Sequence, residues 1–390
     1  MILNIPLAWL QLSRQTSRFL VALAGIAFIA VLMFMQIGFQ DALYVSATKL
    51  HNNLQGDLFL ISAQYKSLTS NQSFSRWRLY QALGFEGVES VSPLYMQFAK
   101  LKNRINGLKF PMYVIGIDPV KSVFTMSDVQ EKLKLLQIPN MVLFDRASRP
   151  EFGAIAKEFE QGKSVKVEIF GYLAFVGYKV QVGGLFSLGP SFGVDGNLIV
   201  STSTFLAIFP DRPVQNIDIG IIKLKPDANP QKVLANLSAK LPKDVKVVTR
   251  QEFIKMEKDY WTLRTPIGFM FYLMVFMAFF VGVVVIYQIL YSNISSHLAE
   301  YATLKAMGFK DKYLLIVVFQ QALILGTLGY IPGFAISICL YDIAKNMTQL
   351  PVAMNIQKAI LVLISAILMC LVSGFLSTNK LRNLDPADIF

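Results

Sequence analysis

The sequence predicts an α-helical membrane protein with four transmembrane helices and a large α+β domain outside the membrane. Of the 390 residues, 54% are hydrophobic and 16% are charged, and the mean hydropathy is +0.48. The charges are unevenly distributed along the chain, which indicates membrane spans combined with a polar domain. The supply of apolar residues is ample for a core, so disorder is excluded as the main state.

Four long segments contain no Asp, Glu, Lys or Arg. They are 22, 32, 29 and 21 residues long and cover 19–40, 265–296, 313–341 and 359–379. About 20 apolar residues cross a bilayer as a helix, so each segment is long enough to be a transmembrane helix. The first segment exceeds the apolar part of a cleaved signal peptide and is predicted to be retained. Buried helices of a large soluble protein are the alternative, which four such segments disfavour.

The basic residues next to these spans predict their orientation. The flanks 1–18, 297–312 and 380–390 together carry seven basic residues, whereas the loop 342–358 carries only Lys345 and Lys358. The seven residues are Arg14, Arg18, Lys305, Lys310, Lys312, Lys380 and Arg382. The positive-inside rule then places segment 1–18, segment 297–312 and the tail 380–390 in the cytoplasm of an inner-membrane protein. Segment 1–18, which is apolar and contains Trp9, is predicted to be interfacial.

The segment 41–264 is predicted to fold outside the membrane, in the periplasm, on a helical stalk. Short β-branched or aromatic runs predict strands at 110–116, 164–170, 178–182 and 197–200, and apolar spacing predicts helices at 128–137 and 230–241. Strand-like runs flank the second helix, so 216–250 is predicted to be a β-α-β unit. Seven glycines in 171–196 favour turns. The stalk is predicted from helical spacing in 41–54 and 251–263.

No residue pattern predicts catalysis. His51 and His297 are far apart in sequence, and His51 is predicted to be a surface residue. Both cysteines lie in apolar runs, which disfavours a disulfide scaffold and a zinc site. Residues 162–164 are similar to the end of a phosphate-binding loop, but Lys157 stands where that motif needs glycine, so a turn before a strand is predicted. We expect no enzyme activity and no bound metal or cofactor.

Other polar and small residues indicate packing rather than chemistry. Spans without ionisable residues argue against an ion-coupled transporter. Interhelical hydrogen bonds are expected from Gln36, Gln40, Gln288, Gln320 and Gln321. Gly326, Gly329 and Gly333 are predicted to form a helix-packing face. Lys100, Lys102, Arg104 and Lys109 form the densest basic cluster, which favours a solvated hairpin; contact with anionic lipid or a protein is the alternative, and no nucleic acid is expected.

Two segments resemble the signature of MacB/FtsX-type ABC transporter permeases. One runs from Glu300 through Leu304 and Lys305 to Gly308, similar to the family pattern E-x-A-x-L-[KR]-A-x-G. The other is the tail, where Asp385, Pro386 and Asp388 are followed by Ile389 and Phe390 in place of Ala and Leu. Residues 7–13, 34–39 and 54–58 are similar to the cyanobacterial DevC subgroup. The resemblance covers nearly the whole chain.

This resemblance implies a MacB-like, type VII ABC permease fold. Porter-like parts are expected at about 55–125 and 216–250, with an inserted lobe at about 126–215. It also implies a homodimer that works with a separate DevA-like ATPase, which binds ATP and magnesium. A DevB-like periplasmic adaptor and a TolC-like outer-membrane channel are the further partners implied, for export of a glycolipid or another amphiphilic substrate.

The segment 297–312 is predicted to be the contact with that ATPase. Leu298, Tyr301, Leu304 and Met307 recur on one side of a short helix, and Gly308 can cap it. Glu300 near its start and Lys305 near its end favour the helix dipole. A groove on an ATPase could hold this apolar face; a helix resting on lipid is the alternative.

ATP-driven dimerisation of the ATPase is then expected to move these helices, and the stalk to move the outer domain. Three other functions remain open at this stage. They are an FtsX-like regulator of a cell-wall hydrolase, a lipoprotein-releasing permease, and a membrane enzyme whose active site lies outside.

Overall fold

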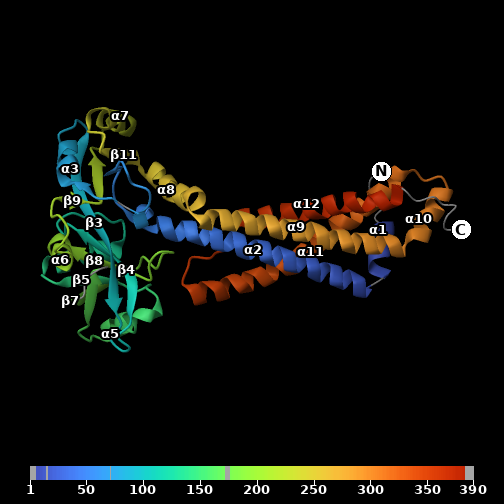
Figure 1. Ribbon diagram of the computed structural model, residues 1–390, viewed down its shortest axis with the longest axis horizontal. Helices are drawn as coiled ribbons and strands as arrows, with labels where there is room; N and C mark the ends of the chain where they lie inside the picture. The colour runs from blue at the N-terminus through green and yellow to red at the C-terminus, as the bar shows by residue number, and fades with distance from the viewer. Residues whose placement is uncertain (1–5, 15, 71, 172–175, 383–390) are drawn as a thin grey trace. The chain divides into compact units, whose positions relative to one another are not determined.

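The computed structural model describes residues 6–14, 16–70, 72–171 and 176–382 and consists of two compact units. The helical unit comprises residues 1–42, 266–347 and 352–390, and the α/β unit comprises residues 43–265 and 348–351. Helix α2, Thr16–Asn53, begins in the helical unit and ends in the α/β unit. The helices α1 to α12 and strands β1 to β11 are drawn in Figure 1.

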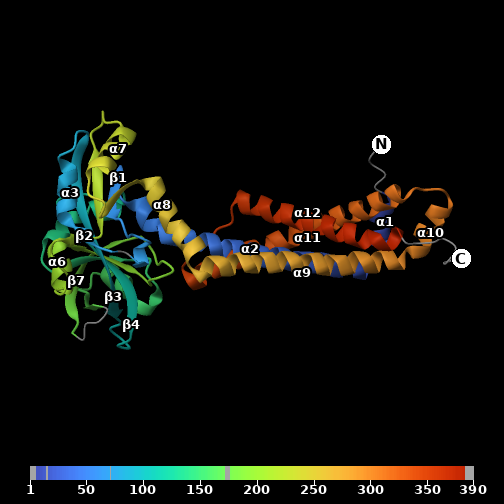
Figure 2. The same ribbon diagram turned by 45° about the horizontal axis from the view of Figure 1, so that its top comes forward.

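The helical unit is built from long apolar helices. Besides α2 they are α1 Pro6–Arg14, α9 Pro266–Ser296, α10 Leu298–Ala306, α11 Asp311–Thr348 and α12 Ile356–Arg382. Among the described residues, α2, α9, α11 and α12 each contain a stretch long and apolar enough to cross a membrane. The four spans predicted from the absence of charge therefore correspond to four helices. Figure 2 shows α9, α11 and α12 running alongside one another.

Glycines bring these helices into close contact. A Cβ atom at Gly329 of α11 would lie 2.7 Å from the Cβ of Ile26 on α2, and one at Gly333 would lie 2.8 Å from the carbonyl oxygen of Ala27. A Cβ at Gly326 would lie 2.9 Å from the Sγ of Cys370 on α12. Real side chains do not tolerate such distances, so α11 can pack this closely on α2 and α12 only with glycine at these positions.

An ion pair lies where α2 leaves its uncharged segment. Lys358 Nζ lies 2.6 Å from Asp41 Oδ2 and donates to the carbonyl oxygen of Ala353 at 2.7 Å. The Lys358 side chain is only 7% exposed, so its charge is compensated by these two contacts rather than by solvent. This pair joins the start of α12 to α2.

The α/β unit has a nine-stranded main sheet with helices on both faces, and β2 and β9 pair in a separate two-stranded sheet. Its strands are β1 Leu58–Ser62, β2 Phe74–Ser75, β3 Val88–Lys102, β4 Lys109–Ile117, β5 Met141–Asp145, β6 Lys166–Gly171, β7 Tyr178–Phe186, β8 Asn197–Ser201, β9 Asn216–Ile217, β10 Ile219–Leu224 and β11 Val245–Thr249. Its helices are α3 Arg76–Leu83, α4 Ser127–Gln130, α5 Ile155–Glu160, α6 Thr202–Ile208, α7 Pro230–Lys240 and α8 Arg250–Asp259, with 3₁₀ turns η1 Leu68–Ser70, η2 Leu133–Gln137 and η3 Pro150–Phe152 and the π-helical turn η4 Tyr260–Arg264.

The strand order of the main sheet is β11-β1-β10-β3-β4-β8-β5-β7-β6, and β6 also pairs with β3. The six strands β3, β4, β8, β5, β7 and β6 therefore close into a barrel. Strand β1 lies antiparallel between β10 and β11, so the β-α-β unit predicted at 216–250 exists with an additional strand inserted. The long strand β3 belongs to both parts, because its first half pairs with β10 and its second half with β6.

Apolar residues alternate between the two faces of this sheet, as the strand period of two requires. In β1, Leu58 and Leu60 pack with Leu79 of α3 and Phe205 of α6. Phe59 and Ile61, in contrast, pack with the end of α2 and with α8. Both faces are therefore covered, which explains why all five residues of β1 are buried.

Several local predictions can be compared with these elements. The predicted strands correspond to β4, β6, β7 and β8, and the basic cluster lies on the β3–β4 hairpin, where Lys102 pairs with Lys109. Residues 162–164 form a turn before β6, with Gly162 at φ +77°. The single helix predicted at 128–137 is wrong: α4 and η2 are two short pieces with Glu131 and Lys132 between them. The predicted stalk helix is continuous in α2 but breaks at Thr265, where the backbone is extended before Pro266.

The surface position predicted for His51 is also wrong. His51 is 1% exposed, and its ring lies 4.3 Å from that of Phe253 on α8, measured between centroids. Its Nε2 lies 3.8 Å from Oε2 of Glu257. Sequence spacing placed His51 on the stalk, but it could not show that α8 folds back against this part of α2.

Glu257 is the buried acid of this cluster. Its Oε2 accepts hydrogen bonds from Tyr65 Oη and the Leu68 N–H, both at 2.9 Å, and its Oε1 accepts one from Trp261 Nε1 at 3.0 Å. Burial raises the pKa of Glu257 from 4.5 to about 7, although these three hydrogen bonds oppose the increase. The carboxyl group therefore changes its charge near neutral pH.

The packing of α11 on α2 gives a first testable prediction. We expect Gly329→Ala to destabilise the helical unit by about 1–3 kcal/mol, because the new methyl group overlaps Ile26. Gly374→Ala is the matched control, since a Cβ at Gly374 lies in ordinary contact, 3.5 Å from Ala322 Cβ. Unfolding of both variants by denaturing detergent measures the difference. Equal stability of the two would contradict this packing.

The pKa of Glu257 gives a second prediction, for the full chain in mild detergent. An acid whose pKa is higher in the folded state stabilises the protein below its unfolded pKa, and this stabilisation is lost as pH rises through the folded pKa. Glu257 should therefore lower the thermal midpoint between about pH 5 and about pH 8. His51, whose burial lowers its pKa from 6.5 to about 3, opposes this decrease below about pH 6.5. Asp218, whose burial raises its pKa to about 6 against the effect of Arg212, contributes in the same direction as Glu257.

Glu257→Gln keeps the size of the side chain and removes its titration, so the decrease should be smaller in this variant. Asp259→Asn, on the same helix, should retain the full decrease. Thermal melts followed by tryptophan fluorescence provide the measurement. If Glu257→Gln shows the same pH dependence as the unmodified chain, the carboxyl group does not titrate as described.

Candidate functional site

Helix α10 lies between α9 and α11 and ends in a defined turn. Gly308 has φ +92°, its N–H donates to the Lys305 carbonyl at 3.0 Å, and the Phe309 N–H donates to the Leu304 carbonyl at 3.1 Å. This hydrogen-bond pair is the Schellman motif, which satisfies carbonyl groups at a helix end and favours glycine in the left-handed position. Gly308 therefore fixes the direction in which the chain leaves α10.

One side of α10 packs into the helical unit. Tyr301 is 1% exposed and belongs to a cluster with Ala8 of α1, Ile294 of α9 and Leu314 of α11. Leu298 and Leu304 pack against the same cluster from its edge. These contacts bury the apolar stripe that the sequence predicts and hold α10 against three other helices.

The carboxamide of Gln11 on α1 connects these helices by hydrogen bonds. Its Oε1 accepts from Tyr301 Oη at 3.0 Å and from Gln321 Nε2 of α11 at 2.7 Å. Its Nε2 donates to Glu300 Oε2 at 3.0 Å. Gln11 is 3% exposed, so its bonds to Tyr301 and Gln321 are shielded from water, whereas the Glu300 side chain is 46% exposed. The loss of either buried bond would leave a buried polar group unpaired.

The hydrogen-bond network extends to α9 at both ends. Asn293 Nδ2 donates to Gln321 Oε1 at 3.4 Å, and His297 Nδ1 lies 3.1 Å from Glu300 Oε1. Glu300 thus contacts both α1 and His297, the residue between α9 and α10, in addition to its favourable position in the first turn of α10. The network ties α1, α9, α10 and α11 together at one end of the helical unit.

The opposite side and the last turn of α10 are exposed. Met307 is 64% exposed and Phe309 39% exposed, and Ala299 and Thr303 are also exposed. Of the apolar set predicted to meet an ATPase, the structure directs Leu298, Tyr301 and Leu304 toward the chain's own helices. Met307 is the member of that set available to another protein. The tail residues Asp385, Pro386 and Asp388 lie outside the described residues.

Sequence reasoning missed Gln11. The only local signal is a polar residue within the apolar stretch 5–12, and a buried polar group of that kind is expected to have a partner. Its partners come from α10 and α11, about 290 and 310 residues later in the chain, so spacing alone could not identify them. Gln321 was expected to form interhelical hydrogen bonds, and it does so with Gln11 and Asn293.

Among the described residues, no group of three or more His, Cys, Asp or Glu side chains is placed to hold a metal ion. The cysteines Cys339 and Cys370 are both free. The arrangement around α10 consists of packing and hydrogen bonds, which suits a contact surface rather than a reaction centre.

Comparison with known proteins matches the part of the chain that contains this site. Residues 272–386 match the family described as FtsX-like permease C-terminal. No curated protein matches the chain. Among solved structures, the periplasmic region of MacB from Actinobacillus actinomycetemcomitans shares 13% identity over 53% of this chain and 94% of that chain, with a TM-score of 0.35.

The extracellular domain of the noncanonic ABC-type transporter YknZ from Gram-positive bacteria shares 14% identity over 50% of this chain and 99% of that chain, with a TM-score of 0.31. From within α9, through α10 and α11, and to residue 386, the chain is similar to the C-terminal part of FtsX-like permeases.

Proposed function

We propose that this chain is the non-catalytic membrane subunit of an ATP-driven permease, and that a separate ATPase binds at the end of α10. One observation carries the proposal: α10 is anchored on its inner side and exposes Met307 and Phe309 at its last turn. An anchored helix with an exposed apolar end can accept a partner and transmit its displacement. The match to FtsX-like permeases over residues 272–386 supports this assignment.

The orientation in the membrane is part of the proposal. The basic residues Arg14, Arg18, Lys305 and Lys310 flank the spans on the α10 side, so this side faces the cytoplasm, where ATP is present. The α/β unit then lies outside the cytoplasm. Movement of α10 would reach α1, α9 and α11 through the Gln11 network. Helix α2 is joined to α9 by the hydrogen bond from Arg18 to Ser296, and it continues into the α/β unit as one helix.

We propose further that two copies act together and export a glycolipid or similar amphiphile. The resemblance to DevC-type permeases implies a periplasmic adaptor and a TolC-like channel as partners. The absence of ionisable residues from the four uncharged segments supports an energy source outside these spans. Because the α/β unit is the largest part of the chain outside the spans, the adaptor contact is assigned to it.

The binding site gives a third prediction. We expect the purified chain alone to hydrolyse no ATP, and the complex isolated from native membranes to hydrolyse it. Met307→Ala should reduce the ATPase activity that co-purifies with the chain roughly fivefold or more, since it removes an exposed apolar contact. Met347→Ala is the matched control, because Met347 is also exposed, at 81%, but lies at the far end of α11. Equal activity with both variants would contradict the site.

The hydrogen-bond network gives a fourth prediction. Gln11→Leu removes the acceptor of the buried Tyr301 Oη and Gln321 Nε2, at a cost on the order of 1–3 kcal/mol for each buried donor left unpaired. We expect this variant to retain the ATPase but to lose export. Tyr301→Phe removes only one donor, so it should lose less.

Co-purification and export measured together separate binding from coupling. If the Gln11→Leu variant loses the ATPase as well as export, the network shapes the docking surface rather than transmitting motion. Full export by Gln11→Leu would show that the network has no part in coupling.

A further inference from the structure

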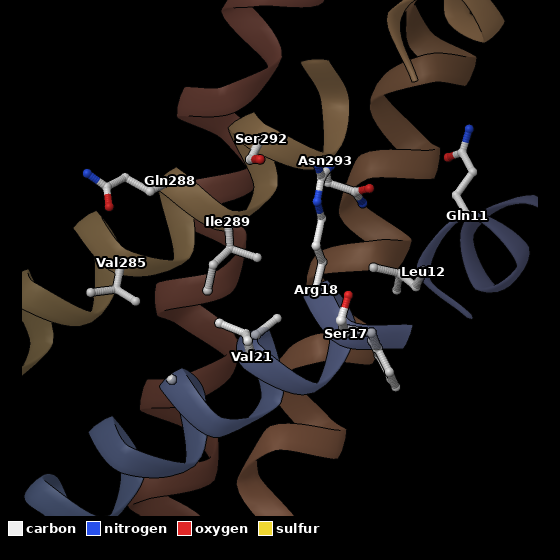
Figure 3. Close-up of a pocket in the computed structure, with 13 residues that line it drawn as sticks. Gln11, Leu12, Ser17, Arg18, Val21, Val285, Gln288, Ile289, Ser292 and Asn293 are labelled. Carbon is white, nitrogen blue, oxygen red and sulfur yellow. The ribbon is translucent and has the colours of Figure 1, made fainter. Parts of the chain in front are cut away.

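A groove opens on the helical unit between the first turns of α2 and the last turns of α9. Its volume is about 510 Å³, and Figure 3 shows the residues that line it. The groove is polar at the end nearest the start of α2 and apolar over the next turns of α2. An elongated molecule with a polar head would therefore match its length and its pattern.

Arg18 dominates the polar end. Figure 3 shows its side chain extending from α2 toward Asn293 of α9, and its Nη1 donates to the hydroxyl oxygen of Ser296. Ser17 and Ser292 line the same end. Within the described part of the chain, no carboxylate forms an ion pair with Arg18, so its positive charge is uncompensated and its remaining N–H groups are available to an anion.

The apolar end lies along the next turns of α2. Val21, Ala22 and Gly25 line it from α2, and Val285 and Ile289 line it from α9, with the polar Gln288 between them. A Cβ at Gly25 would lie in ordinary contact, 3.6 Å from Val285 Cγ1 and 3.8 Å from Ile289 Cδ1. Alanine would therefore fit at position 25, whereas a longer side chain would occupy the groove itself.

The position of Arg18 along the chain defines the depth of the groove in a bilayer. Arg18 directly precedes the uncharged segment 19–40, so it lies at the boundary between the headgroups and the hydrocarbon core. The apolar end then lies just inside the core. Phospholipids have an anionic phosphate and an acyl chain at these same two depths.

We propose that this groove binds an anionic phospholipid. Its phosphate pairs with Arg18 and is surrounded by the hydroxyl groups of Ser17 and Ser292, and one acyl chain lies between α2 and α9 over Gly25. The proposal requires only that α2 and α9 cross a bilayer; it does not depend on the ATPase contact at α10.

Charge distinguishes a lipid from a second copy of this chain. The uncharged segments 19–40, 265–296, 313–341 and 359–379 contain no Asp or Glu. The spans of a second copy could fill the apolar end of the groove, but they would bring no carboxylate to Arg18. Burying this cation under such a surface would be costly. A lipid phosphate supplies the missing negative charge.

Native mass spectrometry of the full chain in mild detergent tests the proposal. Dioleoyl phosphatidylglycerol and dioleoyl phosphatidylcholine serve as probes, because they share their acyl chains and differ in net charge. We expect the first phosphatidylglycerol to bind on the order of tenfold more tightly than phosphatidylcholine, and Arg18→Gln to abolish this preference. Arg14→Gln removes the same charge one helix earlier, outside the groove, and should retain the preference.

Substitutions at Gly25 test the acyl-chain part of the groove. Gly25→Leu should weaken the binding of both lipids several-fold, and Gly25→Ala should leave it unchanged. The proposal is overturned if Arg18→Gln retains the preference, or if Arg14→Gln loses it equally, which would indicate a general surface charge effect. It is also overturned if Arg18→Gln changes the proportion of dimer and leaves lipid binding unchanged. Thermal melts show which variants are folded. If Gly25→Leu does not fold, the two arginine variants alone decide the outcome.

Discussion

The carboxamide of Gln11 is the contact on which the arrangement of the helical unit around α10 depends. It bonds to Tyr301, Gln321 and Glu300 together, and these residues come from α10 and α11, which are far from α1 in sequence. In an apolar interior a polar group without a partner is costly, so only one relative position of these helices satisfies all three. The exposed last turn of α10 is therefore held rigidly by the other helices. The proposed contact with an ATPase would require such rigidity, because a flexible surface would not transmit a displacement.

The α/β unit achieves rigidity by a different route. Strand β3 runs through two parts of the sheet, because it pairs with β10 in the split β-α-β arrangement and with β6 in the closed barrel. A displacement of one part must then move the other, since their shared strand cannot be divided without breaking the ladder. The buried carboxyl group of Glu257 fixes the loop after β1 to α8 through Tyr65 and Leu68. This unit can therefore respond to its attached helices as one body.

The sequence predicts well those features that depend on local composition. A transmembrane helix needs only a long run without charges, so the four spans could be predicted without knowledge of the fold. The strands β4, β6, β7 and β8 were also visible as short β-branched runs. The burial of His51, the pairing of Lys358 with Asp41 and the role of Gln11 were not, because each depends on residues brought together by tertiary packing. The inward direction of Tyr301 belongs to the same class, since an apolar stripe does not show which surface covers it.

Two of the connections between the units, at α2 and at Thr265, differ in their backbone, and this difference bears on the proposed mechanism. Helix α2 passes from one unit to the other without interruption, whereas Thr265 is extended between the π-helical turn and α9. Pro266 explains the break, because proline disfavours a helical conformation in the residue before it and has no N–H to continue the ladder. A continuous helix resists bending, and an extended residue allows it. Under the proposed function, displacement at α10 would therefore reach the α/β unit mainly through α2, with Thr265 as the point at which the second connection bends.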